Sequence, residues 1–134
     1  MKSVDKLHFI TAGMPLRTKG SYNEAFDILS DIKLDGMEME FVHGVRISDS
    51  NKSVVKDKSN LNNFIITAHA PFYINLNSPE PEKIEASINR IIETVNVASD
   101  VGAYSITFHA AFYMGKEREA VYSMVKNAME KVYK

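Results

Sequence analysis

The chain has 134 residues, a formal net charge of -1 and no cysteine. A composition of 45% hydrophobic and 25% charged residues excludes wholesale disorder. Without cysteine the chain can form no disulfide and can offer no thiolate to a metal. The balanced charge gives no overall attraction to nucleic acid. With no signal-like or membrane-length apolar run, we expect one cytoplasmic domain over residues 1–134.

The first third of the chain predicts a strand, a helix and a second strand. The segment His8–Ala12 is β-branched and aromatic, which is typical of a strand. A helix is expected next, because Ser21 and Glu24 have the spacing of a capping box before apolar residues at helical intervals. Asp35-Gly36 is expected to end that helix. The alternating segment Met37–Val42 then predicts a second strand.

The remaining chain repeats this order twice after a polar stretch. Residues 43–63 are polar, and we expect only a short helix near their centre. The nearly continuous apolar run Phe64–Ala70 predicts a strand covered on both faces. Glu82–Val101 has one apolar stripe and predicts a long helix, followed by a strand at Ala103–His109 and a helix at Lys116–Tyr133.

Four strand-then-helix units without a hairpin signal predict a parallel α/β sheet with right-handed crossovers. A closed (βα)8 barrel needs about 250 residues, so this chain corresponds to a (βα)4 half of a TIM barrel with its helices outside. Four unclosed strands leave two open edges, which favour aggregation. We therefore expect a missing C-terminal half-barrel or self-association to close the sheet.

Two histidines occupy matching positions in two of these units. Ile66–His69 reads I-T-A-H and Ile106–His109 reads I-T-F-H. A lone histidine at a strand end is usually structural, but adjacent parallel strands lie about 4.8 Å apart, so His69 and His109 are placed to bind one metal ion together. Glu40 is the candidate third group. It is either a direct ligand, a group acting from the substrate side, or merely water-facing.

Aromatic and basic residues lie in the loops at the same end of the predicted sheet. Each histidine is followed by an aromatic pair, Phe72-Tyr73 and Phe112-Tyr113. These rings either pack over the barrel mouth or form a platform for a base or sugar, and stacking on a base is worth about 1–3 kcal/mol. Arg17 and Arg46 are candidates for phosphate contact, although loop cations are usually just solvated.

Four segments in order resemble the N-terminal half of the endonuclease IV family, in particular its archaeal-type members. They are T-A-G-M-P at Thr11–Pro15, M-E-M-E-F-V at Met37–Val42, H-A-P-F-Y-I-N-L at His69–Leu76 and F-H-A at Phe108–Ala110. The third segment is the most specific, and matching stretches run from about residue 7 to residue 113.

The resemblance implies a xylose-isomerase-like TIM barrel that hydrolyses the phosphodiester 5′ to abasic sites in double-stranded DNA with three zinc ions. His69 and His109 match the first two family ligands, both on one zinc. Arg46 and Phe72-Tyr73 match loops that enter the DNA at the lesion. The chain departs from the family at Ala110-Ala111, where Pro-Gly is frequent, and the remaining family ligands come from later strands.

Two other functions stay open at this point. The first is a metal-dependent sugar isomerase or epimerase of the same barrel superfamily, because fold alone does not separate these reactions. The second is a non-catalytic half-barrel that binds a partner. Because two histidines cannot hold three zinc ions, we expect these 134 residues alone to have little or no nuclease activity.

Overall fold

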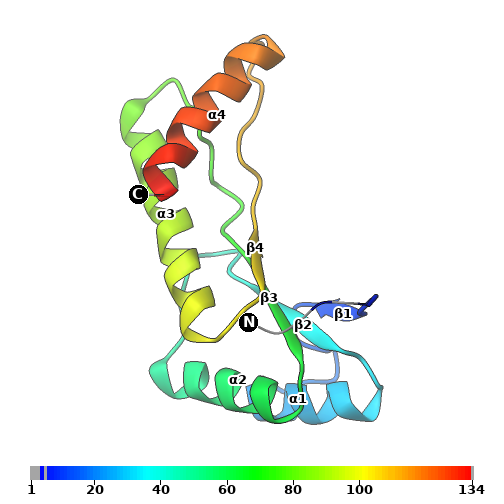
Figure 1. The fold of residues 1–134 in the computed structure, drawn as a ribbon. Coiled ribbons are helices and arrows are strands. Elements are labelled where there is room, and N and C mark those ends of the chain that lie inside the picture. The colour runs from blue at the N-terminus through cyan, green and yellow to red at the C-terminus, as the bar shows by residue number, and fades with distance from the viewer. Residues whose placement is uncertain (1–3, 5, 134) are drawn as a thin grey trace.

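The structure is a computed structural model that describes residues 4 and 6–133, in which strands and helices alternate along the chain (Figure 1). The elements are β1 (Ile10–Ala12), α1 (Tyr22–Asp31), β2 (Gly36–Glu40), α2 (Asp49–Leu61), β3 (Ile65–His69), α3 (Pro81–Asp100), β4 (Ser105–Thr107) and α4 (Arg118–Tyr133). The strands form one parallel sheet in the order β1-β2-β3-β4. The predicted (βα)4 half of a TIM barrel is confirmed.

The two faces of this sheet have different environments. Met37 and Met39 of β2, with Ile66 and Ala68 of β3, are buried in one cluster with apolar residues of α1, α2 and the end of α3. Because side chains alternate along a strand, the intervening residues point to the opposite face. On β2 these are Glu38, which is partly exposed, and Glu40, which is exposed. The helices therefore cover one face, as on the outside of a barrel.

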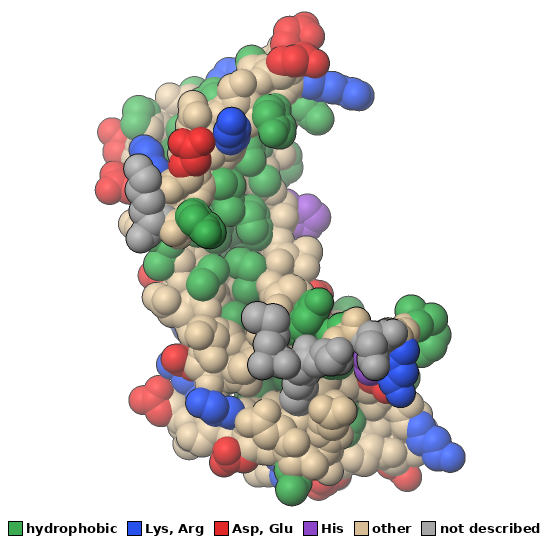
Figure 2. All heavy atoms as spheres, in the orientation of Figure 1, with side chains coloured by type: hydrophobic (Ala, Val, Ile, Leu, Met, Phe, Trp, Pro, Cys, Tyr) green, Lys and Arg blue, Asp and Glu red, His purple; other side chains and the backbone are tan. Residues whose placement is uncertain are grey.

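A second core lies beyond the carboxyl end of β3. Ala70, Ile74 and Leu76, in the segment after the strand, are buried together with Ile88 of α3 and Ala128 of α4. Figure 2 shows that the molecule is curved around a hollow and that hydrophobic side chains gather over α3 and α4. The segment after His69 is thus a fixed part of the core, which matters for the site.

The start of α1 differs from the capping box expected from the sequence. Ser21 is the N-cap residue, but its side chain makes no capping hydrogen bond. The Glu24 carboxylate instead accepts from the Lys19 backbone N–H at 2.8 Å. Glu24 therefore satisfies a donor just before the helix rather than the N–H of Ser21, and it tethers the loop after β1 to α1.

The turn between α1 and β2 also differs from expectation. The helix ends at Asp31, with Ile32 as C-cap, and Lys33 makes the turn in the left-handed region at φ 59°. Gly36 begins β2 rather than ending the helix. A Cβ atom there would lie 1.8 Å from the Ile65 carbonyl oxygen, so only glycine fits the close approach of β2 to β3.

Both outer strands are shorter than predicted. The Phe9 N–H donates to the Asp35 carboxylate at 2.8 Å, while the Phe9 carbonyl oxygen accepts from the Asp35 backbone N–H at 2.8 Å, so before β1 only one of the two bonds joins backbone to backbone. At the other edge β4 ends at Thr107, because its neighbour β3 ends at His69 and the chain then turns at Phe72-Tyr73. His109 therefore lies two residues beyond its strand.

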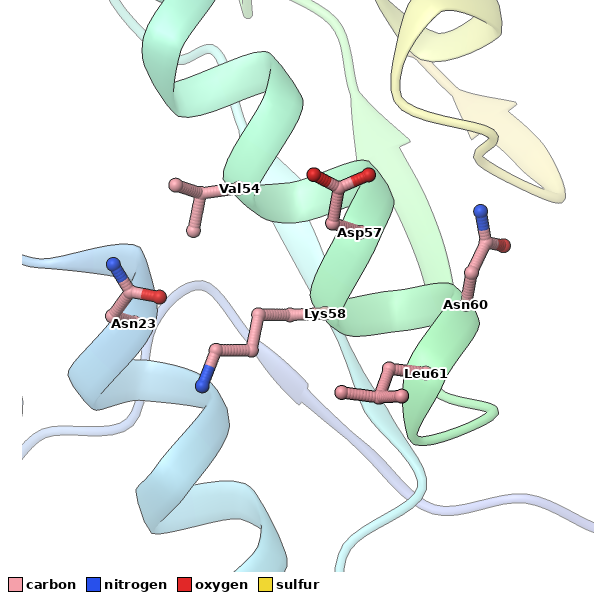
Figure 3. Close-up of a pocket in the computed structure, with 6 residues that line it drawn as sticks. All are labelled: Asn23, Val54, Asp57, Lys58, Asn60 and Leu61. Atoms are coloured by element: carbon pink, nitrogen blue, oxygen red, sulfur yellow. The ribbon is translucent and has the colours of Figure 1, made fainter.

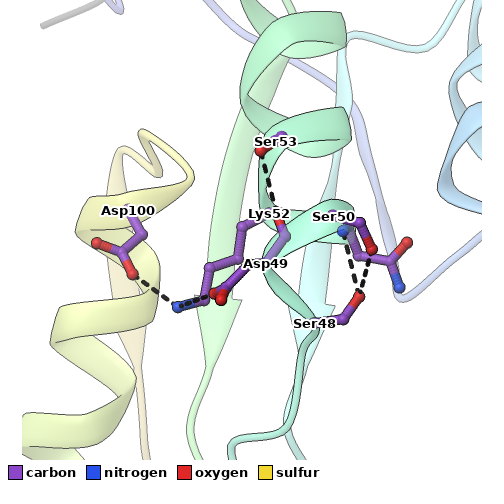
Figure 4. Close-up of polar contacts among 7 residues, drawn as sticks. Ser48, Asp49, Ser50, Lys52, Ser53 and Asp100 are labelled. Carbon is purple, nitrogen blue, oxygen red and sulfur yellow. Dashed lines mark hydrogen bonds and ion pairs between the residues drawn. The ribbon is translucent and has the colours of Figure 1, made fainter.

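The polar stretch after β2 forms a longer helix than expected. Ser48 is the N-cap of α2, and its hydroxyl accepts from the Asn51 N–H at 3.3 Å. Lys52 then bridges to Asp100 at the end of α3 at 2.8 Å and to Asp49 at 3.4 Å (Figure 4). These contacts raise the pKa of Lys52, the hydrogen bond with Asp100 being the largest cause. Caps and inter-helix contacts thus support a helix that apolar periodicity hardly marks.

The other helices follow the predicted ranges closely. α3 starts one residue before the predicted Glu82 and ends one residue before Val101, and Gly102 follows with a positive φ of 72°. α4 starts at Arg118, two residues after the expected Lys116. No helix within residues 4 and 6–133 has the length and apolar character needed to cross a membrane.

Replacing Gly36 should disrupt the sheet. We expect Gly36→Ala to lower the free energy of unfolding by about 3 kcal/mol or more, since its Cβ would overlap the Ile65 backbone rather than a movable side chain. Urea unfolding measures this. Gly102→Ala is the matched control, because the space there is open and only its positive φ opposes a side chain, at about 1 kcal/mol. Equal losses in both variants would contradict the steric explanation.

Asp35 should make stability depend on acid pH. The Phe9 N–H holds the pKa of Asp35 below its ordinary 3.8, partly opposed by burial and assisted by His8 and Lys6. A lowered folded pKa adds stability above about 3.8 that is lost as pH falls through the lower folded value. Asp35→Asn should therefore flatten the fall in unfolding free energy below pH 4. Asp31→Asn, at an exposed carboxylate, should leave that slope unchanged.

Candidate functional site

The predicted ligands lie at the carboxyl ends of neighbouring strands. Glu40 ends β2 and His69 ends β3, and the two residues are direct partners in the parallel register. His69 is paired in turn with Thr107, the last residue of β4. Paired residues of parallel strands point to the same face. Glu40 and His69 therefore belong to the open face, at the end of the sheet where barrel enzymes carry their active sites.

The two histidines lie side by side. The ring centroids of His69 and His109 are 5.4 Å apart, with their planes inclined by 49°. His69 Nδ1 lies 2.9 Å from the Ala70 carbonyl oxygen. When Nδ1 carries the ring proton it donates to this oxygen, which leaves the lone pair of Nε2 free to bind a metal. His69 is partly buried and His109 is exposed.

The third predicted group is turned toward another element. A Cβ atom built on Gly13 would lie 3.0 Å from Glu40 Oε2, so the carboxylate rests against the loop after β1. Within residues 4 and 6–133, no three His, Cys, Asp or Glu side chains cluster closely enough to hold a metal ion. A catalytic zinc usually has three protein ligands. The residues present fit zinc as a pair of imidazole donors and leave its shell incomplete.

The remaining carboxylate of β2 has a structural partner. The Thr67 hydroxyl donates to Glu38 Oε2 at 3.4 Å, across the β2–β3 pair. His8, at the opposite end of the sheet, has its Nδ1 3.6 Å from Asp35 Oδ1 and belongs to the β1 edge. Neither contact reaches the histidine pair. Glu38 and His8 therefore support the sheet and are not part of the candidate site at its carboxyl end.

The loops after β2 and β3 bring the predicted DNA-contact residues together. Phe72 packs edge-on against Tyr73, with centroids 5.3 Å apart, and against His43 of the β2 loop at 6.4 Å. Next to His43, a Cβ on Gly44 would lie 3.6 Å from the Tyr73 hydroxyl and 3.9 Å from Arg46 Nε. We call His43, Arg46, Phe72 and Tyr73 the aromatic platform. Arg17 is exposed in the β1 loop, outside these contacts.

Two asparagines tie the loop after β3 to the loop after β4. The Asn77 side chain is fully buried and donates from Nδ2 to the carbonyl oxygens of Phe112 at 2.8 Å and Tyr113 at 3.3 Å. The Phe112 N–H donates back to Asn75 Oδ1 at 3.3 Å, and Lys116 Nζ donates to Asn77 Oδ1 at 3.0 Å. We call this network the asparagine clasp.

The clasp positions the segment that carries His109. Leu76 N–H also donates to the Ala110 carbonyl oxygen at 2.9 Å, next to that histidine. Because β4 ends at Thr107, these loop contacts, rather than a strand ladder, hold the chain beyond it. Sequence reasoning found no role for Asn75 and overlooked Asn77. The signal available in the sequence was the pair of asparagines, Asn75 and Asn77, two residues apart in an otherwise apolar segment.

An open pocket elsewhere on the molecule has different chemistry. It measures about 620 Å³ and lies between α1 and α2, on the helical side (Figure 3). Its lining includes Leu61, Asp57 and Lys58, and the Lys58 ammonium is 3.3 Å from Asp27 of α1. Among the described residues, no histidine lines it. The pocket therefore lies away from the histidine pair and the aromatic platform.

The parallel strands, the outer helices and the two histidines at the carboxyl end of the sheet are typical of one half of a TIM-barrel protein. The chain belongs to the xylose isomerase-like TIM barrel family, whose sequence profile matches residues 26–134. An uncharacterized protein of Methanocaldococcus jannaschii is 36% identical over 126 residues, which cover 94% of this chain and 45% of that protein.

Solved structures with the same fold carry out different reactions. Endonuclease IV from Thermus thermophilus has a TM-score of 0.68 at 14% identity, over 94% of this chain and 48% of its own. D-psicose 3-epimerase from Clostridium cellulolyticum H10 has a TM-score of 0.71 at 11% identity, over 95% and 47%. The chain thus spans about half the length of these relatives. At these identities the likeness shows the fold alone.

Breaking the clasp should loosen both loops. Asn77→Asp replaces two donors by a carboxylate facing the carbonyl oxygens of Phe112 and Tyr113, and we expect it to destabilise the fold by about 1–3 kcal/mol. Hydrogen exchange at the Phe112 amide should accelerate as well. Asn96→Asp, at an exposed site on α3, is the control. Unchanged exchange in the Asn77 variant would contradict the clasp.

Proposed function

We propose that this chain forms the first half of the active site of an endonuclease IV-type DNA repair enzyme. The proposed reaction is zinc-assisted hydrolysis of the phosphodiester 5′ to an abasic site in double-stranded DNA. The observation that carries the proposal is the contact between the rings of His69 and His109 at the carboxyl end of the sheet. The motif around His69 and the likeness to an endonuclease IV support it.

The histidines supply the metal-binding part of this proposal. The Ala70 carbonyl oxygen orients the His69 ring, and His109 is brought alongside by the clasp. Zinc bound there would lower the pKa of a coordinated water and offset the charge of the phosphate. Since only two donors converge among residues 4 and 6–133, we propose that the other ligands come from a half-barrel that closes the sheet, either further chain or a second copy.

The aromatic platform supplies the DNA-binding part. Phe72 and Tyr73 are 55% and 41% exposed, which leaves ring surface for a nucleobase beside the gap of an abasic site. Arg46 lies next to these rings and offers a guanidinium to the phosphate backbone. Arg17 is proposed as a further phosphate contact from the β1 loop. A balanced net charge is compatible with such a local binding surface.

The proposed activity is tested on a duplex oligonucleotide with one abasic site. We expect the complete barrel to nick it with added zinc and to leave a 3′-hydroxyl that a polymerase extends. His69→Ala and His109→Ala should each reduce nicking at least about 100-fold, because each removes a metal ligand. His8→Gln is the matched histidine control and should nick like the wild type, with its folding checked by thermal unfolding.

Three outcomes would contradict the proposal. No nicking by the zinc-loaded complete barrel would exclude the nuclease. Metal-dependent interconversion of ketoses without nicking would favour the epimerase reaction of D-psicose 3-epimerase, a structural neighbour. DNA or partner binding that is insensitive to both chelator and His69→Ala, without turnover, would identify a non-catalytic half-barrel.

A further inference from the structure

A cation on α3 packs against the aromatic platform. The Arg90 guanidinium carbon lies 4.6 Å from the centre of the Tyr73 ring. Tyr73 contacts Phe72 edge-on, and Phe72 contacts His43 in the same way, with interplanar angles of 84° and 89°. Four side chains therefore form a continuous row in which each contacts the next, from the middle of α3 to the loop after β2. They are Arg90, Tyr73, Phe72 and His43.

The charge of Arg90 is met by a ring rather than by a carboxylate. None of the ion pairs found within residues 4 and 6–133 includes Arg90. The side chain is partly buried on a helix that is held in the core. A guanidinium lying over an aromatic face is attracted by the ring's quadrupole, and its planar shape fixes the ring's orientation as well.

Tyr73 connects this helix to the loop that carries Arg46. Its ring lies by Arg90, and its hydroxyl lies 3.6 Å from the Cβ position of Gly44. An exposed loop ring without such neighbours would sample several rotamers and would lose that freedom on binding a ligand, at a cost in affinity. The Arg90 guanidinium over the Tyr73 ring and the Phe72 ring beside it reduce that cost before any ligand arrives.

We propose that Arg90 is a positioning residue of the DNA-binding surface, an inference that rests on the proposed nuclease function. Arg90 packs on the face of the Tyr73 ring, and the Tyr73 ring packs against Phe72 with the two ring planes nearly perpendicular. Phe72 is the more exposed of the two rings and presents its surface to the base beside the abasic site. Arg90 itself acts through Tyr73 and makes no contact with a phosphate.

The test is a double-mutant cycle between Arg90 and Tyr73. The probe is a fluorescein-labelled duplex with a single tetrahydrofuran residue as the abasic site, and its binding is followed by anisotropy at several salt concentrations. We expect Arg90→Gln to weaken binding about 2- to 10-fold, as for the loss of one ordered side chain, and Arg90→Lys to restore part of it. The same Arg90→Gln change in a Tyr73→Leu background should have no further effect.

Controls separate positioning from charge and from folding. Lys56→Gln removes one exposed cation from α2 and should leave affinity unchanged. Arg90→Gln should preserve the slope of log affinity against log salt, whereas loss of a phosphate contact would reduce it by about one. Thermal unfolding of each variant confirms that the same fold is compared, and Arg90→Lys serves if Arg90→Gln unfolds.

Each contrary result has a distinct meaning. Equal affinity of the wild type for abasic and intact duplex would overturn the proposed function and this inference with it. Selective wild-type binding that Arg90→Gln leaves unchanged would overturn the inference alone. A reduced salt slope, with a loss of affinity that persists in the Tyr73→Leu background, would make Arg90 a phosphate contact and also overturn it.

Discussion

The structure depends on the close parallel pairing of β2 with β3. Gly36 lies against the backbone of Ile65, and this approach sets the register along the whole pair. The same register buries Met37 and Met39 under the helices and places Glu40 beside His69 on the open face. A slip of one residue would exchange the two faces of β2. The absence of a side chain at Gly36 thus allows the pairing that sets both the buried face of β2 and the position of the candidate site.

The two histidines reach the site by different physical means. His69 is the last residue of a central strand, with neighbouring strands on both sides. His109 follows an edge strand, and its segment is held by hydrogen bonds from Leu76 and from the asparagine clasp. The two copies of the I-T-x-H repeat are therefore held in place by different contacts. Secondary structure positions one imidazole and a buried amide network positions the other.

The sequence was sufficient for features that depend on local periodicity. Strand and helix order, the parallel arrangement and the convergence of His69 and His109 follow from alternation, helical spacing and the repeat. The lengths of the two edge strands were less predictable. The length of β4 depends on where its neighbour β3 ends, and the start of β1 depends on the hydrogen bond from the Phe9 N–H to the Asp35 carboxylate. The Asn77 contacts and the Arg90–Tyr73 packing join residues 35 and 17 positions apart, and no local pattern marks such pairs.

The asparagine clasp has a consequence for how this barrel can change during evolution. The loops after β3 and β4 share buried hydrogen bonds, so a change of length between His69 and Asn77 would displace the segment carrying His109. Insertions and deletions in one loop must then be matched in the other. The exposed turn at Pro79 and Glu80 lies outside the clasp, just before α3. Variation in length is expected to accumulate there, while the spacing on either side of it stays fixed.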